Sequence, residues 1–119
     1  MTTAVPAPSS RDLPHPTPGE IRLEGVLHAL SDPVRLRIVR ELAAEGVPLS
    51  CSHFDLPVSK STTTHHFRVL RESGVIRQNY EGTAKMNGLR RDDLDDLFPG
   101  MLDSLLTAAT HQAGRHSGA

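Results

Sequence analysis

The chain has 119 residues, enough for one domain with its own hydrophobic core. Thirteen Lys and Arg against 14 Asp and Glu give a formal charge of −1, so overall basicity does not point to nucleic acid. The single cysteine, Cys51, excludes an internal disulfide framework and an all-cysteine zinc site, and it suits a reducing cytoplasm. Because no apolar run reaches roughly 18 residues and no signal-like segment opens the chain, we expect neither a membrane span nor secretion.

Residues 1–19 contain five of the nine prolines, set among small and polar side chains. Such a segment buries too little apolar surface to offset its ordering entropy, so we predict a disordered arm. Its one basic residue, Arg11, makes it a weak candidate for phosphate binding. We predict one folded domain over 20–109 and a flexible tail over 110–119.

Two helices are predicted next. The first has apolar residues at the spacing i, i+3, i+4 and i+7, namely Leu23, Val26, Leu27 and Leu30. The second begins after Asp32, which can cap it, with Pro33 at its first position and Gly46 as its stop. Its face opposite the apolar stripe carries Arg35, Arg37 and Arg40.

The spacing of the next signals is typical of a helix-turn-helix. Residues 47–57 have proline near both ends and predict a short helix of one to two turns. Ser59 is a good N-cap for a longer helix that runs to about Ser73, with Gly74 as its stop. A short helix followed after a few residues by a helix with a polar start forms this motif.

After Gly74 the hydrophobic period changes from 3.6 to 2, which predicts a β-hairpin over 75–89 that turns at 81–83. A last helix begins near Asp92 and is interrupted at 98–100, where Phe-Pro-Gly stands. The predicted fold is therefore mainly α with a small β-hairpin. From Ser59 to Arg91, seven basic residues against two acidic ones give a local charge of +5, and an aspartate-rich stretch follows. A basic unit of this kind can bind DNA although the whole chain is neutral.

The helix over 59–73 has a polar face suited to DNA. At about 100° per residue, Thr63, Phe67 and Leu70 gather on its core side, and the opposite side carries Ser61, Thr62, His65, Arg68 and Glu72. Arg68 can pair with guanine or phosphate, and His65 can donate to a major-groove acceptor. Ser61 and Thr64 can bond base edges or phosphates, and Lys60 at the helix start can lie against a phosphate.

Two stretches carry a family resemblance. Residues 29–38 read ALSDPVRLRI and residues 59–76 read SKSTTTHHFRVLRESGVI. They resemble ALADPTRLRIL and SQSTVSRHLKVLREAGLV of the ArsR/SmtB winged helix-turn-helix regulators, and the Glu-Gly pair at 81–82 matches the wing sequence REGR of that family. The resemblance, which runs from about Glu20 to Leu106, implies the element order α-α-α-α-β-β-α and a homodimer formed by the first and last helices.

The resemblance also implies a function, a dimeric transcriptional regulator that reads a palindromic operator. In that family the fourth helix reads the major groove, and the wing meets the DNA backbone or minor groove. Carried over by position, the contacts are Ser61, Thr64, His65 and Arg68, with Gln78, Thr83 and Lys85 on the wing; with Lys60 and Thr62 they form the predicted DNA-binding set. His66 occupies a nearly fixed histidine position, for which we expect a structural hydrogen bond.

The signal to which such a regulator responds is left open by the sequence. The metal box C-V-C of many family members is replaced here by Cys51-Ser52-His53, and Asp103, His111 and His116 do not reproduce the other common site. Cys51 and His53, joined by His111 or His116 from a second copy of the chain, would suit nickel or zinc. The alternatives are a small buried thiol beside a surface histidine, a separate effector-sensing partner protein, another ligand, or no effector.

Two further readings remain. The first is a winged-helix module that docks proteins and no longer binds DNA; the polar, basic helix face argues against it, because a docking face would expose more apolar surface. The second is an enzyme, which has little support: the chain has no Gly-rich phosphate loop, and the adjacent His65 and His66 point to different faces of their helix. His28 on the first helix is expected in a dimer interface or in the core.

Overall fold

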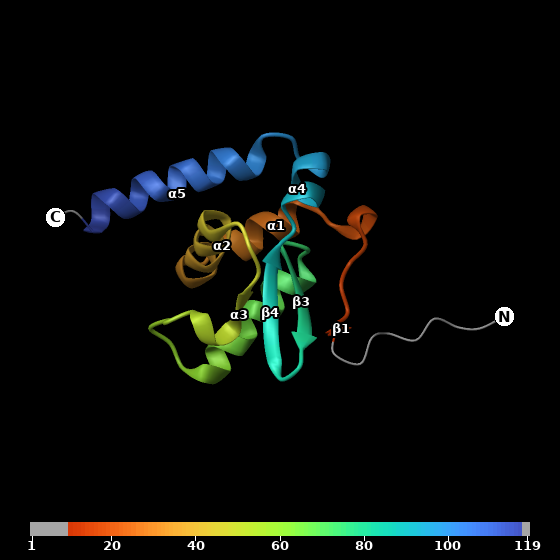
Figure 1. Ribbon diagram of the computed structural model, residues 1–119. Coiled ribbons are helices and arrows are strands. Elements are labelled where there is room, and N and C mark those ends of the chain that lie inside the picture. The colour runs from red at the N-terminus through yellow and green to blue at the C-terminus, as the bar shows by residue number, and fades with distance from the viewer. Residues whose placement is uncertain (1–9, 118–119) are drawn as a thin grey trace.

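The computed structural model describes residues 10–117 as a helical body from which a β-hairpin, the wing, extends (Figure 1). The elements in chain order are β1 (Ser10–Asp12), the 3-10 turn η1 (Pro18–Glu20), α1 (Leu23–Leu30), α2 (Pro33–Glu45), β2 (Leu49–Ser50), the 3-10 turn η2 (Cys51–His53), α3 (Lys60–Glu72), β3 (Ile76–Glu81), β4 (Ala84–Leu89), α4 (Arg91–Leu97) and α5 (Met101–Ser117). This confirms the predicted mainly α winged helix-turn-helix. Within the described range, no helix is long and apolar enough to cross a membrane.

The ends of α2 lie where the local signals predict them. The carboxylate of Asp32 accepts the backbone N–H groups of Val34 and Arg35 at 2.9 and 3.1 Å, and Pro33 occupies the first helical turn. These bonds satisfy N–H groups that have no partner within the helix. Gly46 ends α2 in the left-handed region, at φ 71°.

The ends of α3 also follow the predicted signals. The Ser59 hydroxyl oxygen accepts the N–H of Thr62 at 3.2 Å, which caps the first turn. After the helix, Gly74 has φ 87°, and a Cβ at this position would lie 2.5 Å from Cγ1 of Ile21. A side chain at 74 would therefore be strained by its backbone conformation and would also collide with a core residue.

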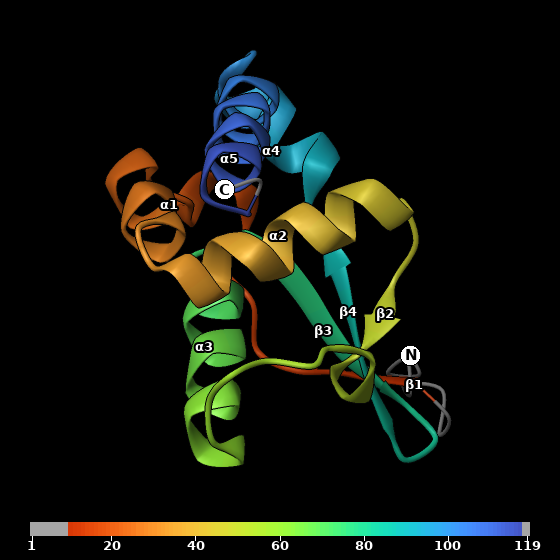
Figure 2. The same cartoon turned by 90° about the vertical axis from the view of Figure 1, so that its left-hand side faces the viewer.

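The sheet has the strand order β1-β3-β4-β2, with each neighbouring pair antiparallel. β3 and β4 form the predicted hairpin: Ile76 lies opposite Leu89 at its base, and Glu81 lies opposite Ala84 beside the turn. β1 pairs with the outer side of β3 and β2 with the outer side of β4 (Figure 2). Both sides of the hairpin are therefore partly covered by a short strand.

The segment 10–19 is not the disordered arm that its prolines predict. The N–H of Leu13 donates to the carbonyl of Gln78 at 3.3 Å, and the N–H of Gln78 donates to Nε2 of His15 at 2.8 Å. The carbonyl of Pro16 accepts Nη1 of Arg90 at 2.9 Å. A proline-rich segment suits the outside of a sheet, because it needs few N–H bonds of its own. Residues 1–9 of the predicted arm lie outside the described residues.

Two other predicted segments differ in extent. The short helix predicted within 47–57 is a single turn of 3-10 helix, η2, and β2 precedes it, because Leu49 and Ser50 pair with β4 and use backbone groups that a longer helix would need. The interruption at 98–100 is confirmed, with Gly100 at φ 79° between α4 and α5. However, α5 continues through 110–117, which we predicted to be a flexible tail. This stretch contains no proline, and Gly114 alone does not end the helix.

A buried polar cluster joins α1, α2 and α3 beside the apolar core. Arg35, which the sequence placed on the outer face of α2, is only 7% exposed. Its guanidinium donates to the carbonyls of Ala29 and His28 at 2.7 and 3.3 Å and lies 3.1 Å from Nδ1 of His66. Nε2 of His66 lies 3.8 Å from the carboxylate of Asp32. The structural role expected for His66 is thus observed, and the cluster holds α3 against α2.

The cap on α2 gives a pH-dependent prediction. Burial alone would raise the pKa of Asp32, but the N–H of Arg35, the charge of His66, the N–H of Val34 and the charge of Arg35 together hold it below its usual value. A carboxyl with a lowered folded-state pKa stabilises the fold above its unfolded pKa, about 3.9, and this stability is lost as the pH falls through the folded value. We expect Asp32→Ala to lower the free energy of unfolding by about 1 kcal/mol at neutral pH and by less near pH 3. Urea unfolding of both proteins across this range measures the difference, and a difference independent of pH would contradict the assignment.

Candidate nucleic-acid interface

One side of α3 presents most of the predicted DNA-binding residues to solvent. The exposed members are Lys60, Ser61, Thr64, His65 and Arg68, and Thr62 is half-buried beside them. On the opposite side, His66, Phe67 and Leu70 are buried. Figure 2 shows α3 at the same end of the molecule as the hairpin tip, whereas α1 and α5 lie at the other end.

The hydroxyl groups at the start of α3 are partly engaged within the helix. The hydroxyl of Thr64 donates to the carbonyl of Lys60 at 3.1 Å, and that of Ser59 donates to Thr62 at 2.9 Å. With its proton used, the oxygen of Thr64 offers lone pairs, which match a base amino group better than a phosphate. Arg68 carries five N–H donors, a geometry that matches the O6 and N7 acceptors of guanine.

On the wing, the structure brings two of the three predicted residues to the tip region. Thr83 is exposed in the turn, and Lys85 follows it on β4 as a half-buried residue. The ammonium of Lys85 lies 5.9 Å from the centre of the Tyr80 ring, directly across the hairpin. This contact holds the stem of Lys85 against β3 beside the tip.

Gln78 is the one predicted contact that the structure places elsewhere. Its side chain is fully buried, its oxygen accepts Nη1 of Arg71 at 2.8 Å, and its nitrogen donates to the side-chain oxygen of Asn87 at 2.7 Å. Side chains alternate along a strand, so position 78 faces the body together with Ile76, while Arg77 faces solvent. Gln78 stands two residues after the apolar Ile76, so the alternation in the sequence already indicated that both side chains face the body. Gln78 is therefore removed from the predicted DNA contacts.

The basic segment from Ser59 to Arg91 is less positive at its surface than its composition suggests, because several of its arginines pair with carboxylates. Buried Arg90 contacts the carboxylate of Asp93 at 2.9 Å, and Arg77 lies 3.8 Å from the same carboxylate. Arg91 pairs with Asp95 and Asp103, which ties α4 to α5. The aspartates that follow the basic segment in sequence thus fold back against it. The cations along α3 and the wing tip are Lys60, Arg68, Arg71 and Lys85, and of these Arg71 is half-buried and bonded to Gln78.

The candidate metal ligands are not brought together within the described residues. Cys51 is half-buried, and its sulfur accepts Nδ2 of Asn87 at 3.2 Å. His53 is exposed and lies 3.9 Å from a Glu41 oxygen, and His111 and His116 are exposed on α5. Over 10–117, no group of three or more His, Cys, Asp and Glu side chains is arranged to hold a metal ion. His28 is exposed and not in the core.

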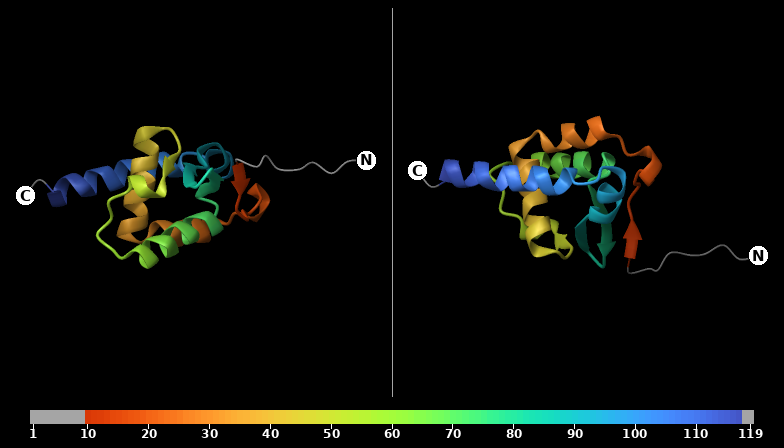
Figure 3. Two further views of the ribbon diagram at one scale, coloured as in Figure 1. Left: turned by 60° about the horizontal axis from the view of Figure 1, so that its bottom comes forward. Right: turned by 90° about the horizontal axis from the view of Figure 1, so that it is seen from above.

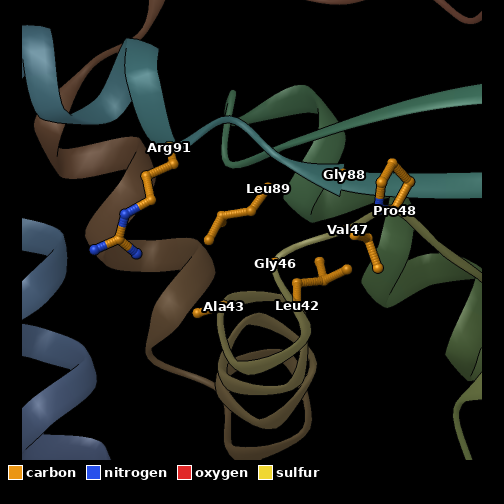
Figure 4. Close-up of a pocket in the computed structure, with 8 residues that line it drawn as sticks. All are labelled: Leu42, Ala43, Gly46, Val47, Pro48, Gly88, Leu89 and Arg91. Atoms are coloured by element: carbon orange, nitrogen blue, oxygen red, sulfur yellow. The ribbon is translucent and has the colours of Figure 1, made fainter.

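A cavity of about 170 Å³ opens between the end of α2 and β4 (Figure 4). Leu42 and Val47 line one side, and Leu89 lines the other. Its lining includes no residue of α3 or of the wing turn, so it does not belong to the surface described above.

Comparisons with known proteins agree with this geometry. Residues 30–79 match a family described as a helix-turn-helix domain. The chain is 35% identical over 82 residues to YceK of Bacillus subtilis, an uncharacterized HTH-type transcriptional regulator; the match covers 67% of this chain and 82% of the relative. A second HTH-type regulator, from Methanocaldococcus jannaschii, is 34% identical over 59 residues, covering 49% of this chain and 66% of its own length.

The fold also has a solved counterpart. The crystal structure of an ArsR family transcriptional regulator superimposes with a TM-score of 0.58 at 20% identity, over 69% of this chain and 90% of that one. Together with the exposed polar face of α3, these matches define the class, a winged helix-turn-helix protein. The chain belongs to the HTH-type transcriptional regulators.

Proposed function

We propose that this protein is a sequence-specific transcriptional regulator whose homodimer reads a palindromic operator. The observation that carries the proposal is the exposed polar and basic face of α3, which lies at the same end of the molecule as the wing tip. The alternative, a module that docks proteins, would need apolar surface on this face. The large hydrophobic side chains exposed in the described residues are Leu23 and Leu27 of α1, and Val47, which follows the glycine that ends α2.

The proposal assigns each contact a role. Arg68 and His65 reach base edges in the major groove, with Ser61 and Thr64 beside them. Lys60 and the N-terminus of α3 meet a phosphate, to which the helix dipole contributes. Thr83 and Lys85 meet the backbone or the minor groove, with Thr62 supporting the start of α3. These contacts combine positioning on phosphates with reading of bases.

The dimer in this proposal forms through α1 and α5. Leu23 and Leu27 are 42% and 44% exposed, although they belong to the apolar stripe of α1. Leu27 also lines a cavity of about 230 Å³ between α1, α2 and α5, whose other lining residues include Leu36, Leu105 and the polar Gln112. The C-terminal part of α5 extends beyond the other elements (Figure 3). A second copy packed here would cover the exposed leucines and present both α3 helices on one side, as a two-fold operator requires.

We expect Leu27→Asp to make the protein monomeric. An aspartate there would have to be buried without a partner in the dimer, while in the monomer it stays in water. Loss of the second half-site should weaken binding to a palindromic duplex by about 100-fold or more. Sedimentation measures the mass, and Val47→Asp is the matched control, because Val47 is 57% exposed and lies just after α2. A Leu27→Asp protein that stays dimeric would place the interface elsewhere.

The function is tested by selecting duplexes from a randomised DNA library with the purified chain. We expect a palindromic sequence to be enriched, and its affinity, measured by fluorescence anisotropy, to fall roughly 10³-fold or more between about 50 and 200 mM salt as counterions are released. A library without an enriched sequence, together with salt-insensitive binding to a protein, would favour the docking module instead.

The same assay locates the sensor. We propose that the signal enters either at Cys51 and His53 joined by histidines of α5 from a second copy, or through a separate effector-sensing protein. Binding is compared in chelator and after addition of nickel or zinc, the ions that thiolate and imidazole ligands suit. A metal-dependent affinity assigns sensing to this chain. An affinity that ignores both ions assigns it to a partner or to no effector.

A further inference from the structure

A chain of buried hydrogen bonds links α3 to both strands of the wing. Gln78 on β3 and Asn87 on β4 are directly opposite in register, and both are fully buried. The amide nitrogen of Gln78 donates to the amide oxygen of Asn87 at 2.7 Å. On the side of α3, Arg71 donates to the oxygen of Gln78 at 2.8 Å. On the other side, Asn87 donates to the carbonyl of Leu49 at 3.1 Å.

The main chain of Gln78 is held as well. Its N–H donates to Nε2 of His15 at 2.8 Å, and its carbonyl accepts the N–H of Leu13 at 3.3 Å. One residue therefore connects the N-terminal segment, α3 and β4. Such a residue has little freedom to rotate, because each movement would break a bond in a buried environment where no water replaces it.

Because of its position, a small rotation within this network would move the wing relative to α3. Glu81, where β3 ends beside the turn, lies three residues along the strand from Gln78, or roughly 10 Å at about 3.3 Å per residue. A rotation of the hairpin by about 10° at Gln78 would move this end of the wing by about 2 Å, enough to break a hydrogen bond. Arg71 lies one helical turn beyond Arg68, so the same network also orients the α3 face that carries Arg68.

We propose that Arg71, Gln78 and Asn87 are positioning residues for DNA binding, which set the angle between the wing and α3 so that both reach the duplex at once. The inference rests on the proposed function. An apolar pair at 78 and 87 would fill the same space without a directional bond, so hydrophobic packing alone does not explain two amides in the core. Specific recognition depends on this angle, whereas loose binding to any phosphate backbone does not.

The experiment compares three variants of the full-length chain with the wild type. Gln78→Met combined with Asn87→Val replaces the amide pair by apolar side chains suited to a strand core. Arg71→Met removes the link to α3, and Arg71→Lys restores a donor and the charge. For each, the dissociation constants are measured for the duplex selected by the wild type and for a scrambled duplex of the same length, beside urea unfolding.

We expect the ratio of the dissociation constant for the scrambled duplex to that for the selected duplex to fall about tenfold in the double variant and in Arg71→Met. The affinity for the scrambled duplex should stay unchanged. The ratio should recover in Arg71→Lys. A merely structural role would lower both affinities with the folded fraction and leave the ratio unchanged. A folded double variant with the wild-type ratio overturns the inference. If the double variant does not fold, a wild-type ratio in Arg71→Met overturns it. If the wild type selects no duplex, the proposed function has failed before any variant is compared, and this inference fails with it.

Discussion

Arg68→Ala is expected to weaken binding to the selected duplex by about 1–3 kcal/mol without lowering the stability of the fold. Arg68 is exposed on the polar side of α3, so its side chain adds no core packing. Its planar guanidinium matches guanine or a phosphate in a way that a lysine ammonium does not. Arg68→Lys should therefore recover only part of the loss.

The salt dependence separates the two roles of Arg68. If Arg68 contacts a phosphate, Arg68→Ala weakens binding to all sequences and lowers the slope of log affinity against log salt concentration by about 1. If Arg68 reads a base, the substitution relaxes the base preference at one position of the operator. Arg37→Ala is the control, since Arg37 is an exposed arginine of α2 that pairs with Glu41. Wild-type affinity in Arg68→Ala would remove α3 from the DNA interface.

Phe67→Ala, at the position before Arg68, should in contrast lower the stability of the fold. Phe67 is 1% exposed, and its ring meets that of Phe54 edge-on, with centroids 5.4 Å apart. Removing a buried phenyl ring costs about 3–5 kcal/mol, because the transfer energy is lost and a cavity remains. Small domains have only about 5–15 kcal/mol of stability, so this substitution should unfold a large fraction of the protein at moderate urea.

Urea unfolding followed by circular dichroism measures this loss. Phe98→Ala is the matched control, because Phe98 is only partly buried between α4 and α5 and should cost less. A loss below about 1 kcal/mol for Phe67→Ala would show that α3 does not pack on the core through this face. The two neighbouring substitutions thus separate the face of α3 that supports the fold from the face proposed to bind DNA.

Several features could be read from the sequence because they depend on residues within a few positions of one another. Asp32 and Ser59 cap helices whose first N–H groups are two or three residues away, and Gly46 and Gly74 end them. The alternation after Gly74 predicted the wing. Such signals act within one helical turn or one strand pair, so the fold class and the exposed face of α3 follow from local chemistry. The two family motifs predicted a winged helix-turn-helix regulator, and the comparisons show the class of HTH-type transcriptional regulators.

Other features were decided only by contacts between distant segments. The N-terminal segment is held by two hydrogen bonds with Gln78, one donated by Leu13 and one accepted by His15, which no local pattern in 10–19 predicts. Arg35 and Arg90 are polar in sequence but buried in the fold, since the carbonyls of Ala29 and Pro16 in other segments accept their N–H groups. The sequence gives the type of a charged or amide side chain, but not whether that side chain faces water or a hydrogen-bond partner. Its environment is set by what the rest of the chain packs against it, and therefore only the tertiary structure shows which polar residues remain on the surface.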